Sequence, residues 1–303
     1  MIDARISDRL LVAFALLLGL ACGAPDRETD HLAPHDFRFP QNALVVHALG
    51  GIKGMNYSNS LEALESTLAR DGRFLEVDLS FTADGDLVCF HTKHEKHLGL
   101  DTPVTEIGTS DFLSHRYAAR FTLIDLETLL RKLVDHPDTY LVTDCKHDFN
   151  LCMEKTLSVA ESVDPALIGR IIPQFYKPEQ WLDVAHMEAD RGSFATVIFT
   201  LYRTKIDDDA VVDLVENRRI PVVTMSRKRF NPDLVANLAV IGVDSLVHTV
   251  NQPPAMIAYV NQGVRGLYSD LFVQWNEVVA APATINGPPK GRSQDAAAGP
   301  PPG

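Results

Sequence analysis

Short runs of β-branched and other apolar residues alternate with amphipathic segments along most of the chain. Nine such runs predict β-strands, at residues 43–48, 74–79, 87–91, 140–146, 170–176, 196–202, 221–226, 245–251 and 266–272. Most of the segments between them are long enough for a helix, as at 60–70 and 124–134. Alternation of strands and helices indicates an α/β protein with a parallel sheet.

The second and third predicted strands stand closer together than the others. Little more than Thr82-Ala83-Asp84-Gly85 separates them. Parallel neighbours need a crossover of about a dozen residues, whereas a short Asp-Gly turn makes an antiparallel hairpin. We therefore predict that residues 87–91 form an antiparallel excursion after strand two. The eight remaining strands predict a (β/α)8 TIM barrel.

The first residues are typical of an export signal. Arg5 and Arg9 precede an apolar run at 10–21, which is shorter than the ~20 residues that cross a bilayer. We expect residues 1–22 to be a signal peptide, and the protein to reach the bacterial periplasm or cell envelope or to be secreted. The residues around Cys22 resemble a lipoprotein processing site. A lipid anchor on Cys22 is the one membrane contact that we predict.

The amino-acid composition near the two ends of the chain differs from that of its middle part. Residues 281–303 contain six Pro and four Gly, and such a segment buries too little apolar surface to offset the entropy of ordering it. We predict a disordered tail there, a linker at 23–40 and one barrel domain at 41–280. That domain matches the ~250 residues typical of the fold.

The net charge of the chain limits the class of molecule that it can bind. The chain of 303 residues carries 28 Lys and Arg against 40 Asp and Glu, a net charge of −12 with His neutral. A general nucleic-acid binder needs a basic surface, so we predict no nucleic-acid partner. At 46% hydrophobic and 22% charged residues, the composition is that of a globular protein.

The cysteines leave two alternatives open. Besides Cys22 the chain has Cys89, Cys145 and Cys152, and an exported protein can form a disulfide such as Cys145–Cys152. Three cysteines remain if Cys22 is lipidated, and we favour buried free thiols. No pair has the CxxC spacing of a structural zinc site.

Acidic residues lie in otherwise apolar strands. Glu76 and Asp78 are two apart, as are Asp144 and Lys146, so each pair points to one side of its strand. Functional residues of a TIM barrel gather at the carboxyl ends of the strands. Three carboxylates there would repel one another unless a cation neutralised them, and oxygen ligands suit Mg²⁺ or Ca²⁺. The plainer alternatives are a solvent-facing Glu-x-Asp pair and a simple Asp–Lys salt bridge.

Histidines end two of the predicted strands. His47 ends the first and His91 ends the excursion, close to His94 and His97. Histidine titrates near neutrality, so His47 and His91 are candidates for acid–base chemistry. His47 could instead be a core histidine. His91, His94 and His97 could form a zinc cluster, although no Cys partner has the matching spacing.

The order and spacing of these residues resemble the glycerophosphodiester phosphodiesterase family of the phospholipase-C-like barrels. The resemblance extends from about His47 to Phe272. The segments that carry it are His47, Tyr57-Ser58-Asn59-Ser60, Leu75-Glu76-Val77-Asp78, Thr82-Ala83-Asp84-Gly85, Leu87-Val88-Cys89-Phe90-His91, Asp144-Cys145-Lys146, His248-Thr249-Val250-Asn251 and residues 263–270.

This resemblance implies a barrel enzyme that hydrolyses phosphodiesters with a divalent cation, Mg²⁺ or Ca²⁺. Its substrate would be a small-molecule phosphodiester or a lipid headgroup. The implied site residues are the acid–base pair His47 and His91, the metal ligands Glu76, Asp78 and Asp144, and the substrate-binding residues Lys146 and Asn59.

Some positions depart from the family pattern. Ala48 stands where the family commonly has Arg, Ser58 where it has Glu, and Thr92 where it has Asp. The resemblance therefore implies phosphodiester chemistry more firmly than a glycerol-type substrate. The alternatives are a sphingomyelinase-D-like phospholipase, whose barrel also uses two His and three acidic ligands, and a non-catalytic ligand-binding barrel.

Overall fold

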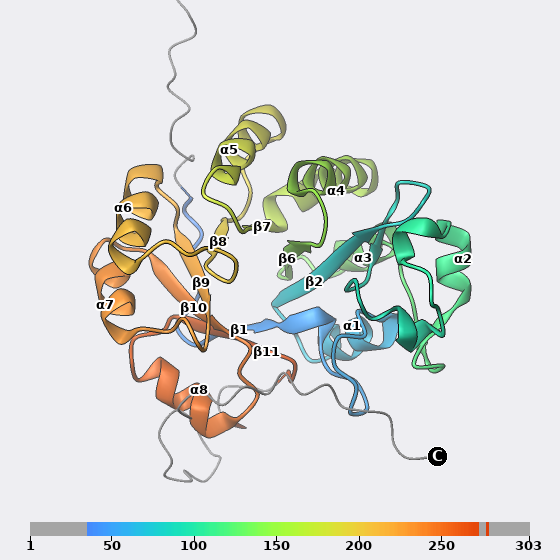
Figure 1. Cartoon of the computed structure of the whole chain (residues 1–303), viewed down its shortest axis with the longest axis horizontal. Coiled ribbons are helices and arrows are strands. Elements are labelled where there is room, and N and C mark those ends of the chain that lie inside the picture. The colour runs from blue at the N-terminus through green and yellow to red at the C-terminus, as the bar shows by residue number, and fades with distance from the viewer. Residues whose placement is uncertain (1–34, 273–276, 279–303) are drawn as a thin grey trace, which may run out of the picture.

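Eight parallel strands close into a barrel in the part of the chain that the computed structural model describes, residues 35–272 and 277–278 (Figure 1). They follow one another around the barrel in sequence order, and the first pairs with both the second and the last. They are β1 (Ala43–Val46), β2 (Phe74–Phe81), β6 (Tyr140–Cys145), β7 (Ile171–Phe175), β8 (Ile198–Thr200), β9 (Val222–Ser226), β10 (Asp244–His248) and β11 (Gly266–Ser269). The predicted TIM barrel is confirmed.

Helices connect successive strands and surround the barrel (Figure 1). They are α1 (Leu61–Leu68), α3 (Leu126–Val134), α4 (Phe149–Val163), α5 (Gln180–Arg191), α6 (Asp208–Arg218), α7 (Pro232–Val240) and α8 (Pro253–Val260), with a 3-10 turn at Pro165–Arg170. Side-chain oxygens of Ser60, Asp125, Asp148 and Asp207 cap four of these helices by accepting a backbone N–H of the first turn. Within the described residues, no helix combines the length and apolar character needed to cross a bilayer.

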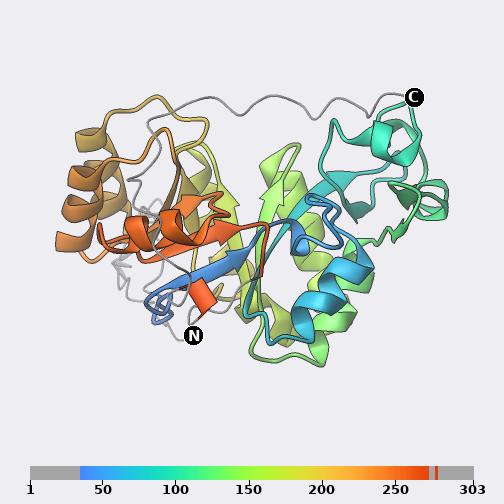
Figure 2. The same cartoon turned by 90° about the horizontal axis from the view of Figure 1, so that it is seen from below.

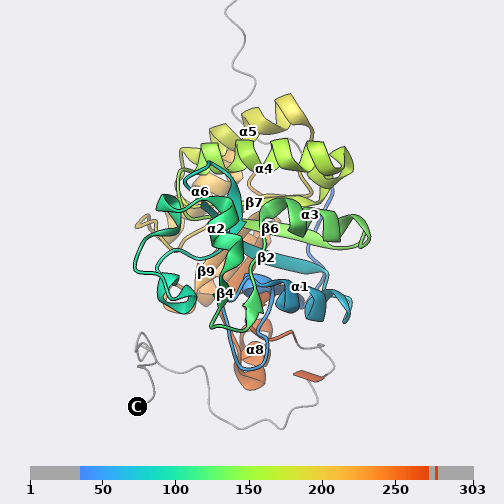
Figure 3. The same ribbon diagram turned by 90° about the vertical axis from the view of Figure 1, so that its right-hand side faces the viewer.

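The excursion after β2 begins as predicted. β3 (Leu87–Cys89) pairs antiparallel with β2, and the turn places Gly85 at φ +77°, a conformation that favours glycine. Two 3-10 turns, α2 and a small hairpin complete it, at Glu95–Leu98, Val104–Glu106, Thr109–Ser114, and β4 (Arg116–Tyr117) with β5 (Phe121–Thr122). Figure 2 shows this part, in teal and green, on the opposite side from the last helices, and Figure 3 views it from the front.

Alternation along the strands separates two apolar cores. Leu75 and Val77 of β2 face the helices, whereas Phe74 faces the barrel interior, so Glu76 and Asp78 also point inward. The barrel interior toward the amino ends of the strands is filled by apolar side chains, which are those of Phe39, Ala43, Val45, Phe74, Val142, Ile172, Ala195, Ile198, Val222, Leu246 and Tyr268. The barrel is therefore packed shut toward the amino ends of its strands, and its polar side chains gather at the carboxyl ends.

The chain enters the barrel at this packed end. Phe39 is fully buried among the interior side chains, and Arg38 donates two hydrogen bonds to Asp244, at 3.1 and 2.7 Å. Part of the segment assigned to the linker thus packs on the barrel. The predicted signal peptide with Cys22, the rest of the linker to residue 34 and the predicted tail at 281–303 lie outside the described residues.

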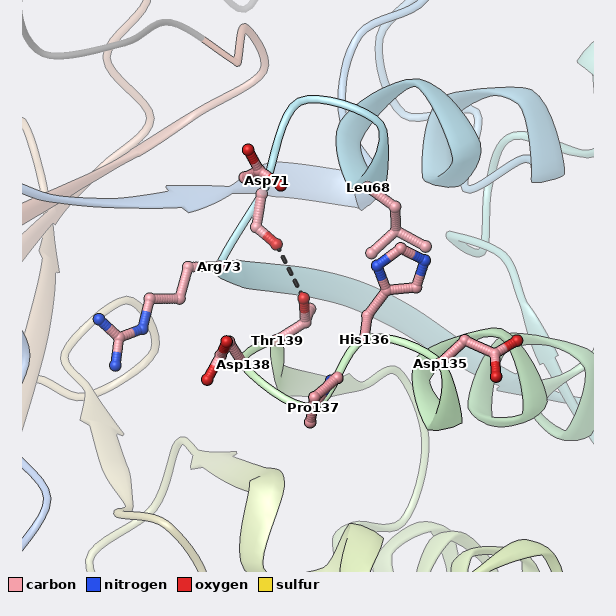
Figure 4. A pocket seen from close by; sticks show the side chains of 9 residues that line it. Leu68, Asp71, Arg73, Asp135, His136, Pro137, Asp138 and Thr139 are labelled. Atoms are coloured by element: carbon pink, nitrogen blue, oxygen red, sulfur yellow. Dashed lines mark hydrogen bonds between the residues drawn. The ribbon is translucent and has the colours of Figure 1, made fainter.

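One surface cavity lies at the same end of the molecule, where β2 and β6 begin (Figure 4). It measures about 520 Å³ and is lined by Leu68, Asp71, Gly72, Arg73, Asp135, His136, Pro137, Asp138 and Thr139. The Thr139 hydroxyl donates to the Gly72 carbonyl at 3.0 Å. None of the predicted site residues lines this cavity.

Cys145 and Cys152 form a disulfide, so the expectation of free thiols is wrong for this pair. The connection from β6 to α4 folds back at once and brings the two Cα atoms to 6.1 Å, within the range that a disulfide spans. Cys89 is a buried free thiol, as expected.

Replacing both cysteines by alanine is expected to lower the free energy of unfolding by about 2–3 kcal/mol, because the disulfide restricts the unfolded chain. Urea denaturation of C145A/C152A and of the unsubstituted protein measures this difference. A reductant should destabilise the unsubstituted protein by a similar amount and leave the variant unchanged. Equal stability of the two proteins under oxidising conditions would contradict the disulfide.

Candidate active site

The three predicted metal ligands meet at the carboxyl end of the barrel. β2 carries Glu76 and Asp78, and β6 carries Asp144, which lies directly beside Asp78 in the parallel register. One oxygen from each carboxylate lies within 4.8 Å of the others, and all three side chains are buried. This placement rules out a solvent-facing Glu-x-Asp pair.

Glu76 shows why this group fits a cation. Its Oε2 accepts the Ala48 backbone N–H at 2.7 Å, whereas its buried Oε1 has no hydrogen-bond partner. Burial and the nearby Asp78 charge raise the pKa of Glu76 to about 8. An unpartnered buried carboxylate oxygen is costly, and a divalent cation coordinated by oxygen would satisfy it. The three carboxylates therefore have the chemistry of a Mg²⁺ or Ca²⁺ site.

Lys146 lies against two of these carboxylates. Its Nζ is 2.6 Å from Asp78 Oδ1 and 2.6 Å from Asp144 Oδ2. Burial lowers the pKa of Lys146, but the two carboxylates outweigh it and raise that pKa. Burial alone would raise the pKa of Asp78. The Lys146 ammonium outweighs burial and lowers that pKa to about 2. The Asp144–Lys146 salt bridge therefore exists, inside the acidic cluster.

His47 faces the same cluster. It opens the 3-10 turn His47–Leu49 directly after β1, with Nε2 3.8 Å from Glu76 Oε2 and Nδ1 2.7 Å from Asp270 Oδ1. Burial lowers the pKa of His47, but Glu76 and Asp270 outweigh it and raise that pKa to about 9. His47 is thus tied to the site by its partners and is more than a core histidine.

Asp270 is a site residue to which the sequence analysis gave no role. It follows β11, and its Oδ2 accepts amide hydrogens from Asn56 at 3.2 Å and Asn251 at 2.6 Å. These bonds aim its Oδ1 at His47. An acidic residue inside the last predicted strand, at 266–272, was the available signal, because closure of a barrel sets the first and last strands side by side.

Tyr57 connects the two candidate histidines. Its ring lies 4.6 Å from the His47 ring and 5.9 Å from the His91 ring, edge-on to both. His91 follows β3, and its Nδ1 lies 2.5 Å from the Thr92 carbonyl oxygen. The excursion therefore carries His91 back to the barrel mouth, where its charge helps to lower the pKa of Asp78.

The neighbouring histidines contact one another along the excursion. His91 stacks on His94 at 4.8 Å, and His94 contacts His97 at 5.6 Å. Burial, with the charges of His91 and His97, lowers the pKa of His94 to about 4. Among the described residues, the three carboxylates are the one group with metal-binding geometry. The zinc alternative is not supported.

Asn59 supports Asp78. Its Nδ2 donates to Asp78 Oδ2 at 2.8 Å, and its Oδ1 accepts the Asp78 backbone N–H at 3.2 Å. The side chain is fully buried. Contact of Asn59 with substrate stays a prediction, and what these bonds provide is a fixed orientation for one carboxylate of the cluster.

Solved structures share this fold. A glycerophosphodiester phosphodiesterase from Parabacteroides distasonis has a TM-score of 0.62 and 17% identity, over 79% of this chain and 96% of that chain. An Oleispira antarctica phosphodiesterase, in complex with the product sn-glycerol-3-phosphate, has a TM-score of 0.63 and 13% identity, over 79% and 97%. The enzyme from Thermotoga maritima has a TM-score of 0.59 and 15% identity, over 77% and 96%. No protein-family model and no curated protein matches the sequence.

Proposed function

We propose that this protein is a metal-dependent phosphodiester hydrolase that acts on glycerophosphodiesters or related lipid headgroup phosphodiesters. The observation that carries the proposal is the meeting of His47 and His91 with three buried carboxylates at one end of the barrel. Solved structures of the same fold are phosphodiesterases, and one holds sn-glycerol-3-phosphate, which supports a small-molecule substrate.

Glu76, Asp78 and Asp144 would hold the divalent cation. When bound, a cation of this kind withdraws charge from a phosphate oxygen and makes the phosphorus easier to attack. Lys146 balances the charge of Asp78 and Asp144, and Asn59 fixes the orientation of Asp78. These contacts keep the carboxylates in place at the barrel mouth.

The two histidines would move the protons. Nδ1 of His47 is engaged by Asp270 and Nδ1 of His91 by the Thr92 carbonyl, so Nε2 of each ring is left for proton transfer. One imidazole takes the proton of the attacking oxygen while the new P–O bond forms. The other protonates the alkoxide that leaves as the old P–O bond breaks. Attack by water gives a phosphomonoester, and attack by a neighbouring substrate hydroxyl gives a cyclic phosphate.

Export stays part of the proposal. Disulfides persist in oxidising compartments such as the periplasm and the cell surface. The Cys145–Cys152 disulfide supports such a location.

Hydrolysis of a phosphodiester panel tests the function. The purified protein is assayed on glycerophosphocholine, sphingomyelin and lysophosphatidylcholine, each with Mg²⁺, with Ca²⁺ and with chelator. We expect metal-dependent turnover of glycerophosphocholine. Turnover of the two lipids alone would establish the sphingomyelinase-D-like alternative. No turnover of any substrate with either metal would favour a non-catalytic barrel.

A further inference from the structure

Arg203 lies at the rim of the barrel mouth, in the turn after β8. Its guanidinium carbon is 4.7 Å from the centre of the Tyr176 ring, and the side chain is exposed. Stacking on an aromatic ring engages the flat face of a guanidinium. The N–H groups in its plane stay available to another partner.

Tyr176 connects this guanidinium to the acidic cluster. It follows β7, and its hydroxyl donates to Asp144 Oδ1 at 2.6 Å. One aromatic ring therefore separates Arg203 from a predicted metal ligand. The ring stands beside β7 and β8, while His47 stands beside β1 and β11.

The charge of Arg203 has no carboxylate partner among the described residues, in contrast to the charges of Arg229 and Lys146. Arg229 in the next loop pairs with Asp208, and Lys146 is bound by two carboxylates. A guanidinium held in place by stacking, with no carboxylate bound to it, is prepared for an anionic ligand. The net charge of −12 makes such a local cation important, because the protein as a whole repels anions.

We propose that Arg203 binds the phosphate group of the substrate at the β8 side of the mouth. The planar fork of arginine donates two parallel N–H bonds to two phosphate oxygens, a geometry that the point charge of lysine cannot reproduce. Tyr176 holds the fork in place on one side and orients Asp144 on the other. This inference rests on the proposed phosphodiesterase function and names a residue that binds its substrate.

The test compares R203Q and R203K with K205Q, an exposed lysine of the same loop, as the matched control. Calorimetry measures binding of sn-glycerol-3-phosphate and, separately, of Mg²⁺ to each protein, and kinetics gives KM and kcat for glycerophosphocholine. We expect R203Q to weaken sn-glycerol-3-phosphate binding and to raise KM by about 10- to 150-fold, as loss of a charge-assisted hydrogen bond predicts. R203K should recover part of the loss, and K205Q should stay within about twofold, since the proposal gives Lys205 no contact with the phosphate.

Binding and turnover separate this inference from the proposed function. Unchanged sn-glycerol-3-phosphate binding in R203Q overturns the role of Arg203 even if hydrolysis proceeds. Weaker Mg²⁺ binding in R203Q without a matching loss of sn-glycerol-3-phosphate binding also overturns it, because Arg203 would then act only through Tyr176 and Asp144. If the unsubstituted protein binds no sn-glycerol-3-phosphate, the inference fails as well. Binding that depends on Arg203 in a protein without turnover would overturn the hydrolase proposal alone.

Discussion

Alanine in place of His47 or His91 is expected to lower kcat by about 100- to 10,000-fold, the contribution of a positioned acid or base. Each imidazole has its Nδ1 engaged, His47 by Asp270 and His91 by the Thr92 carbonyl, so each offers one nitrogen to the substrate. Each imidazole is held by its own partner on a different segment, so we expect that neither replaces the other. Steady-state kinetics on the best substrate of the panel measures the effect.

H136A is the matched control, because His136 lines the cavity at the other end of the barrel and should leave kcat unchanged. D270N should give an intermediate loss, since His47 stays but loses the carboxylate that orients it. Circular dichroism and urea denaturation check that each variant folds. Near-normal kcat in a folded His47 or His91 variant would refute the acid–base assignment.

E76Q is expected to abolish divalent-cation binding within the measurable range and to lower turnover at least about 100-fold. The substitution keeps the shape of the side chain but removes one of three charges that a hard cation needs. Burial and the Asp78 charge oppose the ionisation of Glu76 in the folded protein, whereas glutamine is neutral in the folded and unfolded states, so the variant without metal should be more stable than the unsubstituted protein without metal. Calorimetry with Mg²⁺ and Ca²⁺, turnover and urea denaturation measure the three effects.

E127Q serves as the matched control, because Glu127 is an exposed partner of Arg131 on α3. Its metal binding and turnover should equal those of the unsubstituted protein. Chelator should likewise remove turnover from the unsubstituted protein, and added Mg²⁺ or Ca²⁺ should restore it. Metal affinity that survives in E76Q, or activity that survives chelation, would exclude the metal role of this cluster.

Periodicity was sufficient to predict the strands and the excursion, but not where each strand ends. The run at 196–202 yields a β8 of three residues, Ile198–Thr200, because its pairing with β7 starts only at Ile198 and a turn begins at Leu201. Side-chain alternation predicted that Glu76 and Asp78 share a face, and the register then set Asp144 beside Asp78. Local pattern therefore predicts the acidic cluster well.

The contacts that form when the barrel closes could not be predicted from local sequence patterns. His47 and Asp270 are 223 positions apart, and only the pairing of β1 with β11 brings them together. The Cys145–Cys152 disulfide depends on how α4 packs after β6, which no spacing rule predicts. Tyr176 and Arg203 follow different strands, so their stacking could be identified only from the folded chain.

The buried position of Phe39 determines which end of the barrel an upstream attachment would occupy. Residues 35–39 lie at the amino ends of the barrel strands. A protein or support joined upstream of them is therefore attached to the closed end of the barrel. Immobilisation on a support, or a fusion partner placed upstream, would leave the reactive opening pointing outward.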